Sequence, residues 1–166
     1  GVIQLARAVP LVAETFGGDR VRVAADTLRP LITEKTKILM LNFPNNPTGG
    51  ALTEENVRGI ADLVVEKDLI LVTDEIYAEL TYDRPHVSIA ALPGMKERTV
   101  FLHGFSKALA MTGWRIGYAC APAELIEAMM KIHQYTMLCA PVMSQQAAYE
   151  ALKRPEEDIA RMKESY

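Results

Sequence analysis

The stretch from residue 38 to residue 74 reads ILMLN FPNNPTGGAL TEENVRGIADLVVEK DLILVTD. Its apolar run 38–42 ends in a loop rich in Pro, Asn and Gly, which is typical of a buried strand followed by a break. Thr53 is placed to cap a helix in which apolar residues recur on one face. A second apolar run, 69–73, follows at once. Strand, helix and strand of this kind form a right-handed βαβ unit with parallel strands, which places Asp74 at a strand's carboxyl end.

Two more apolar runs, 99–103 and 116–120, predict two further strands. Polar side chains closely follow three of the predicted strands, namely Asn46, Asp74 and Lys107. Because sites in open α/β sheets collect at the carboxyl ends of strands, we expect parallel strands to bring these side chains to one edge. The predicted fold class is therefore α/β, with a mostly parallel sheet flanked by helices.

Helical patterns are predicted on both sides of this region. Residues 11–16, followed by two glycines, indicate a helix that ends at a glycine stop. Beyond Pro122 the apolar spacing is helical, and Pro141 and Pro155 divide this part into separate helices. The first of these helices has an apolar face formed by Leu125, Ala128, Met129 and Ile132.

The composition argues against several classes of protein. The chain has 166 residues, 49% of them hydrophobic, and a formal net charge of −3, which suits a globular domain with a buried core. Its 18 basic and 21 acidic residues form no basic stripe, so nucleic acid is not expected as a partner. The apolar runs fall far short of the roughly 18 residues of a membrane span. Cys120 and Cys139 lack the spacing of a metal site, and we expect buried free thiols in a reducing cytoplasm.

Lys107 is the residue that says most about the chemistry. It ends the segment Gly-Phe-Ser-Lys at 104–107, and small and apolar residues follow it at 108–111. A lysine taken alone is usually a surface residue. In this setting, partial burial would instead leave a nucleophilic amine, which suits Schiff-base chemistry with an aldehyde cofactor such as pyridoxal 5′-phosphate (PLP).

A PLP site also needs an anion for the pyridine nitrogen and donors for the ring oxygen. Asp74, at a predicted strand end, is either a polar terminus or that anion. Tyr77 is either a core aromatic with a satisfied hydroxyl or a donor to the ring oxygen. Asn46 lies in a loop whose stiffness alone would explain its prolines, but its amide is suited to the same oxygen.

A phosphate group needs hydroxyl and cationic donors. Ser106, next to Lys107, and Arg115, eight positions after the lysine, are suited to a phosphate dianion through charge-assisted bonds. An ordinary surface ion pair is the alternative for Arg115. His103 and Trp114 could act as a general base and a stacking partner, but we interpret both as packing residues, because the lysine already supplies the base.

Three motifs carry a resemblance to a known family. They are Asn-Pro-Thr-Gly at 46–49, Asp-Glu-Ile-Tyr at 74–77 and the segment 104–117 around the lysine. In these motifs and their order the chain resembles the class I/II aminotransferases, the aspartate-aminotransferase-like branch of the fold-type I PLP enzymes. The resemblance runs over nearly the whole chain and is strongest from about residue 38 to residue 145.

The resemblance implies a PLP-dependent aminotransferase, which moves an amino group between an amino acid and a 2-oxo acid. It implies that Lys107 forms the internal aldimine with PLP and later moves a proton at the substrate Cα, with Asp74 and Tyr77 completing the catalytic set. Relatives in this family are homodimers, so dimerisation of the whole protein is expected. The resemblance also implies the contacts of the cofactor. Asp74 would hold the pyridine nitrogen and Lys107 the aldehyde carbon. The ring oxygen would be bound by Asn46 and Tyr77, and the phosphate by Ser106 and Arg115.

Parts of the family pattern are absent from this sequence. Gly104 stands where many relatives carry a serine, so a weaker phosphate contact is expected. No segment resembles the family's glycine-rich phosphate cradle, its stacking aromatic, or the small-domain arginine that binds the substrate carboxylate. We therefore expect residues 1–166 to be part of the PLP-binding large domain, with the N-terminal segment and the C-terminal small domain missing. Alone, this piece is expected to be poorly active and to aggregate or stay molten.

Other functions fit the same residues. A C–S β-lyase or a racemase could use the same site, because the reaction is decided by groups that this chain lacks. A regulator could use such a domain to sense PLP, although nothing here resembles a helix-turn-helix. A cofactor-free remnant is hard to reconcile with the intact set of Lys107, Asp74 and Arg115.

Overall fold

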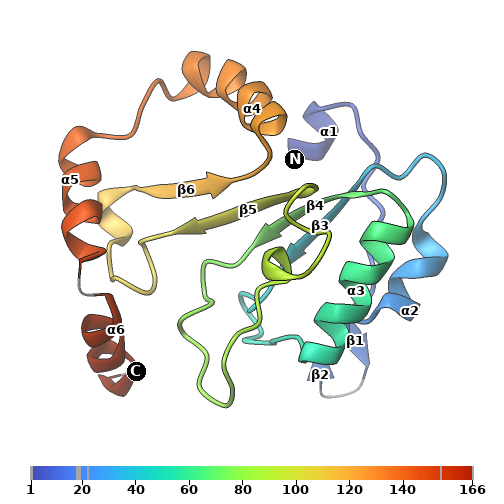
Figure 1. The fold of residues 1–166 in the computed structure, drawn as a ribbon, viewed down its shortest axis with the longest axis horizontal. Coiled ribbons are helices and arrows are strands. Elements are labelled where there is room, and N and C mark those ends of the chain that lie inside the picture. The colour runs from blue at the N-terminus through green and yellow to red at the C-terminus, as the bar shows by residue number, and fades with distance from the viewer. Residues whose placement is uncertain (1, 18–19, 22, 154, 166) are drawn as a thin grey trace.

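The computed structural model describes residues 2–17, 20–21, 23–153 and 155–165 (Figure 1). The strands are β1 (Phe16–Gly17), β2 (Arg20–Val21), β3 (Ile38–Asn42), β4 (Ile70–Asp74), β5 (Thr99–Gly104) and β6 (Gly117–Cys120). The helices are α1 (Val2–Leu5), α2 (Ala25–Leu28), α3 (Glu54–Glu66), α4 (Ala123–Thr136), α5 (Val142–Ala151) and α6 (Pro155–Ser165). Short 3₁₀ turns lie at Arg29–Leu31, Ile89–Ala91 and Thr112–Trp114.

The central sheet has the strand order β3-β4-β5-β6. β3 is parallel to β4 and β4 is parallel to β5, whereas β6 returns antiparallel to β5. The predicted α/β class with a mostly parallel sheet is therefore confirmed. In this register Asp74 lies opposite Asn42 on one neighbouring strand and opposite Leu102 on the other, so three strand ends meet at one edge.

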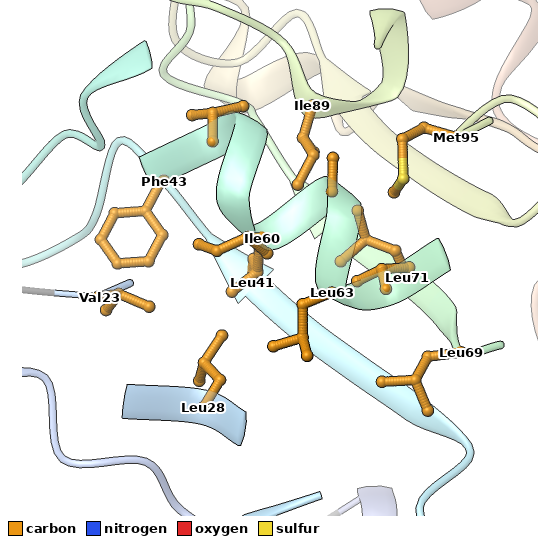
Figure 2. Packing of buried hydrophobic residues seen from close by; sticks show 13 residues of the cluster. Val23, Leu28, Leu41, Phe43, Ile60, Leu63, Leu69, Leu71, Ile89 and Met95 are labelled. Atoms are coloured by element: carbon orange, nitrogen blue, oxygen red, sulfur yellow. The ribbon is translucent and has the colours of Figure 1, made fainter. Parts of the chain in front are cut away.

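Helix α3 covers one face of this sheet and supplies much of the core (Figure 2). The Thr53 side chain accepts a hydrogen bond from the backbone N–H of Asn56 at 3.2 Å, and so caps the helix as predicted. Glu54 and Glu55 lie in the first turn, where negative charge is favourable. The side chains buried on the inner face of α3 are Val57, Ile60, Ala61, Leu63 and Val64.

These helix side chains pack on alternate residues of the strands. Leu41 of β3 and Leu71 of β4 are buried in the same cluster, which Leu28 of α2 joins (Figure 2). Ile38 and Met40 of β3 are 53% and 58% exposed, because successive side chains of a strand point to opposite faces. Among the described residues, the face of β3 away from α3 is therefore largely open.

Two expectations about the outer parts of the chain are wrong. Residues 11–15 form no helix; Phe16–Gly17 instead pairs with β2 in an antiparallel ribbon, and Gly18 lies outside the described residues. A short apolar run cannot by itself distinguish a helix from a strand, and here backbone pairing prevails. Cys120 and Cys139 are free but exposed rather than buried, because Cys120 ends the edge strand β6 and Cys139 follows α4.

Helices α4 and α5 are present where the proline-bounded patterns predicted them, but the described residues do not bury their apolar faces. Helix α4 contains no buried residue, and the buried residues of α5 are Ser144 and Ala148. Figure 1 shows α4, α5 and α6 around the β6 side of the sheet, away from α3. In the part of the chain that the structure describes, no helix is long and apolar enough to cross a membrane.

Replacing the fully buried Leu63 with alanine is expected to destabilise the full-length protein by about 2–5 kcal/mol, because the lost methyl groups leave a cavity. Val65→Ala is the control, since Val65 lies on the same helix but is 41% exposed. It should change the free energy of unfolding by only about 0.5 kcal/mol. Urea denaturation measures both variants, and equal effects would contradict the assignment of the core to this face of α3.

Candidate active site at the strand ends

The loop after β3 is ordered by hydrogen bonds centred on Asn45. The backbone N–H of Asn45 donates to the carbonyl of Gly50, and the N–H of Gly49 donates to the carbonyl of Asn45, both at 2.8 Å. Thr48 Oγ1 donates to Asn45 Oδ1 at 2.9 Å. Gly49 has a φ of +67°, a left-handed conformation that glycine adopts without strain. These contacts shape the loop without using the Asn46 side chain.

Three of the predicted site residues come together at the sheet edge. Asn46 Nδ2 donates to the Tyr77 hydroxyl at 3.3 Å. The Lys107 amine lies over the Tyr77 ring, 5.4 Å from its centroid, within the range of a cation–π contact. The parallel strand order thus joins side chains from three separate segments of the chain.

Asp74 is the last residue of β4 and is half-buried. Its Oδ1 accepts a hydrogen bond from the backbone N–H of Ile76 at 3.2 Å, and its backbone carbonyl accepts one from Asn42 Nδ2 at 3.4 Å. The carboxylate is therefore oriented by the turn that follows it, while the adjacent strand fixes its backbone. Within the described residues, no cationic side chain pairs with it.

Ser106 and Arg115 lie in the loop between β5 and β6, called the lysine loop from here on. Thr112 Oγ1 donates to the Ser106 carbonyl at 2.8 Å, and Arg115 Nη1 donates to the Thr112 carbonyl at 2.8 Å. Arg115 has a φ of +52°, which is uncommon for a residue with a side chain. Thr112 thus joins the two predicted phosphate ligands, but among the described residues no hydrogen bond or ion pair joins either of them to the side chains of the other predicted site residues.

The two ends of the lysine loop meet at a pair of glycines. Gly104 lies opposite Gly117 in the antiparallel register. A Cβ on Gly117 would lie 2.9 Å from the His103 carbonyl oxygen, and one on Gly104 would lie 3.3 Å from the Gly117 Cα. Glycine at position 104 therefore has a packing reason in this chain, because a serine there would require the facing strand to shift.

An open cavity of about 490 Å³ lies beside this loop. Its lining comes from the segments 113–115 and 141–144, and Ser144 Oγ ties the two together by donating to the Trp114 carbonyl at 2.7 Å. Trp114 is 46% exposed. Its interpretation as a packing residue is therefore wrong for the described residues, because nearly half of it is exposed and it lines the open cavity.

Two carboxylate–histidine pairs hold the turn after β4. Glu75 is 1% exposed, accepts a hydrogen bond from Thr73 Oγ1 at 3.2 Å, and pairs with His86 Nε2 at 2.5 Å. Glu79 pairs with His103 Nε2 at 3.1 Å. Neither glutamate nor His86 is among the residues predicted from the sequence, because glutamates are usually exposed and nothing local signals their partners. In the described part of the chain, no group of three or more His, Cys, Asp or Glu could hold a metal ion.

The Glu79–His103 pair shifts the titration of both partners. Burial penalises both charges, and alone it would raise the pKa of the Glu79 carboxyl and lower the pKa of the His103 imidazole. Their hydrogen bond and opposite charges outweigh burial, so the pKa of Glu79 is lowered and the pKa of His103 is raised. Burial, followed by the Glu79 charge, raises the pKa of the neighbouring Tyr118 phenol.

An α/β sheet whose strand ends gather a lysine amine, a carboxylate, a phenol and an amide is typical of enzymes that bind a carbonyl cofactor through lysine. The model of the family "Aminotransferase class I and II" matches residues 2–166. The chain belongs to this family, whose members are PLP enzymes.

Individual relatives match the chain over part of their own length. It is 50% identical over 165 residues to the "Putative aminotransferase YugH" of Bacillus subtilis (strain 168), covering 99% of this chain and 43% of that protein. It is 42% identical over 165 residues to an aspartate aminotransferase of Pyrococcus abyssi, covering 98% and 42%. The crystal structure of an aromatic aminotransferase from Pyrococcus horikoshii OT3 matches with a TM-score of 0.89 and 43% identity, over 95% of this chain and 43% of that one. The chain thus spans about two fifths of the length of these relatives.

The Glu79–His103 pair should make stability depend on pH. Because the pKa of His103 is raised, its contribution is complete below the ordinary value of 6.5 and is lost as pH rises through the raised value. Because the pKa of Glu79 is lowered, its contribution is complete above the ordinary value of 4.5 and is lost as pH falls through the lowered value. The pair therefore stabilises the fold most between these two ordinary values.

Glu79→Gln is expected to destabilise the full-length protein by about 1 kcal/mol at pH 6 and by less at pH 9, because His103 loses its charge as pH rises through its raised pKa. Thermal denaturation at the two pH values measures the difference. Glu54→Gln, which removes the exposed ion pair with Arg58, is the matched control and should have a small effect at both pH values. The same loss for Glu79→Gln at pH 6 and pH 9 would contradict the prediction.

Proposed function

We propose that the full-length protein to which this chain belongs is a PLP-dependent aminotransferase that moves an amino group between an amino acid and a 2-oxo acid. In this proposal residues 1–166 are the central part of its PLP-binding large domain, and the N-terminal segment and the C-terminal small domain lie outside the chain. The observation that carries the proposal is the meeting of Asn46, Tyr77 and Lys107 at the strand ends. Membership of the aminotransferase family supports it.

The chemistry of the donor set fits PLP. The Lys107 amine and the Asp74 carboxylate are both half-buried, and neither has an ion-pair partner among the described residues. Half-buried groups of opposite charge that form no ion pair are typical of a binding site. The cofactor aldehyde would engage the amine, and the protonated pyridine nitrogen would engage the carboxylate.

Each group at the strand ends has a role that its position supports. When bound, PLP draws electrons from the substrate Cα into its ring. Lys107 would supply the amine that condenses with the aldehyde, with water as the leaving group, and the amine would then move a proton at the Cα. Asp74 holds the proton on the ring nitrogen and so maintains its positive charge. Tyr77 and Asn46 donate to the ring oxygen, and their mutual contact keeps both groups near Lys107.

Ser106 and Arg115 hold the phosphate in this proposal. A hydroxyl and a guanidinium form charge-assisted hydrogen bonds with a dianion, and the planar guanidinium can bind two of its oxygens at once. Thr112 joins the two residues through contacts of 2.8 Å on either side. Arg115 also lines the open cavity, which leaves its side chain accessible to a ligand.

Substrates are proposed as a class, because the relatives carry names of different specificity, aspartate in one case and aromatic amino acids in another.

Homodimer formation and a cytoplasmic location of the full-length protein belong to the same proposal. Large exposed apolar side chains on α4 and α5 support a covered surface in the full-length protein. They include Met130 (50% exposed), Tyr135 (86%), Val142 (76%) and Met143 (77%).

Incubation of the full-length protein with PLP, followed by borohydride reduction, is expected to leave a cofactor adduct on Lys107, because this residue is half-buried and its amine forms no ion pair among the described residues. Peptide mass analysis locates the adduct, which Lys107→Ala should abolish and Lys96→Ala, at an exposed lysine, should not. Adducts scattered over surface lysines would contradict the proposal.

A product assay of the full-length protein separates the two reactions. Release of ammonia or sulfide instead of stoichiometric amino transfer would point to a lyase.

Asp74→Asn is expected to lower kcat by about 100-fold or more, because a neutral amide no longer holds the ring nitrogen positively charged in the transition state. Binding of PLP should change much less. Steady-state kinetics and a PLP titration of the full-length protein measure the two effects. Asp62→Asn, on the exposed side of α3, is the control. An unchanged kcat in Asp74→Asn would exclude the role assigned to this carboxylate.

A further inference from the structure

The turn after β4 carries Tyr77 but belongs to no helix or strand. Two backbone hydrogen bonds shape it, one from the N–H of Ala78 to the Glu75 carbonyl at 2.9 Å and one from the N–H of Leu80 to the Tyr77 carbonyl at 3.0 Å. Both bonds lie within the turn, so neither fixes where the turn sits against the sheet. The position of the Tyr77 ring must come from contacts outside it.

Two such contacts dock the turn on adjacent residues of β5. At one end the backbone N–H of Glu75 donates to the Leu102 carbonyl at 3.0 Å. At the other end the Glu79 carboxylate pairs with His103 Nε2 at 3.1 Å. Because Leu102 and His103 are neighbours shortly before Lys107, both ends of the turn are attached to the strand that leads to the lysine.

The imidazole of His103 is held in one orientation. Its side chain is 7% exposed, and its ring stacks on Phe101 with centroids 5.6 Å apart and lies 5.5 Å from the Tyr118 ring. In the neutral imidazole, Nδ1 accepts a hydrogen bond from the backbone N–H of Gly104 at 2.8 Å. The ring therefore connects Glu79 on the turn with Gly104 at the start of the lysine loop.

Tyr77, in contrast, is weakly held by its own side chain. Its hydroxyl accepts a 3.3 Å hydrogen bond from Asn46, an exposed residue on a loop, and its ring faces the Lys107 amine at 5.4 Å. A hydrogen bond of this length to an exposed partner restrains a ring little. The Glu79–His103 contact, at 3.1 Å to a side chain that is only 7% exposed, is the stronger restraint on the turn.

We propose that Glu79 and His103 are positioning residues that set the separation between the Tyr77 ring and the Lys107 amine. Among the described residues, no hydrogen bond, ion pair or ring contact joins Glu79 or His103 directly to these two groups, so they act through the turn and through the end of β5. The inference rests on the proposed function in treating Tyr77 and Lys107 as cofactor ligands. The positioning itself is a property of the protein without cofactor and can be measured there.

The test measures how fast Lys107 reacts with an amine-directed acylating ester in the cofactor-free full-length protein, with the product located by peptide mass. Glu79→Gln and His103→Phe are each expected to change this rate by about threefold or more, because the Tyr77 ring shifts relative to the amine. The double variant should change the rate no more than the larger single effect, since both residues form one contact. Glu54→Gln, which breaks an exposed ion pair on α3, should leave the rate unchanged.

The acylation rate of Lys96, measured in the same samples, distinguishes a change in positioning from a general loosening of the fold. An unchanged rate at Lys107 in both single variants would overturn the proposal, and so would a change shared by the exposed Lys96. A second measurement follows the visible absorbance of PLP-loaded protein against pH, whose midpoint should shift in the same variants. If the wild type takes up no PLP at Lys107, the proposed function fails, while the acylation rates still decide the positioning role.

Discussion

The parallel ladder that joins β3, β4 and β5 is the constraint on which the rest of the structure depends. Its register places Leu41 and Leu71 under α3, where Ile60 and Leu63 are completely buried. A slip of one residue would turn these strand side chains to the opposite face and expose them, so burial fixes the register. The same register sets where each strand ends, and Asp74 depends on it directly. The same register therefore fixes both the packing of the core and the positions of the strand ends at the candidate site.

Beyond the strand ends, each segment of the candidate site is fixed by different chemistry. The loop after β3 is ordered by the amide and backbone of Asn45, which accept and donate within the loop. The turn after β4 is attached by Glu75 and Glu79. The lysine loop is closed by the contact of Gly104 with Gly117. The sheet thus determines where the side chains of the candidate site lie, and these local contacts determine how the side chains are oriented.

Much of this could be predicted from the sequence, because the signals are local. Thr53, the apolar face of α3 and the strand runs depend on residues within a few positions of one another, and the structure contains them. The family followed from motifs that keep their spacing. Burial of Glu75 and its pairing with His86 could not be predicted, because they depend on how distant segments pack. Exposure of Cys120 and Trp114 has the same cause, since burial of a side chain depends on what covers it.

The pairing of Gly104 with Gly117 and the contact of Asn46 with Tyr77 differ in how much chain they close. The glycine pair closes the lysine loop through residues near one another in sequence, and closing a short loop costs little chain entropy. The contact of Asn46 with Tyr77 spans a longer stretch and requires β3 and β4 to be paired already, so it belongs to the slower, nonlocal part of folding. The hairpin that carries Lys107 is therefore closed by local contacts, whereas the contact of Asn46 with Tyr77 depends on the pairing of nonlocal strands.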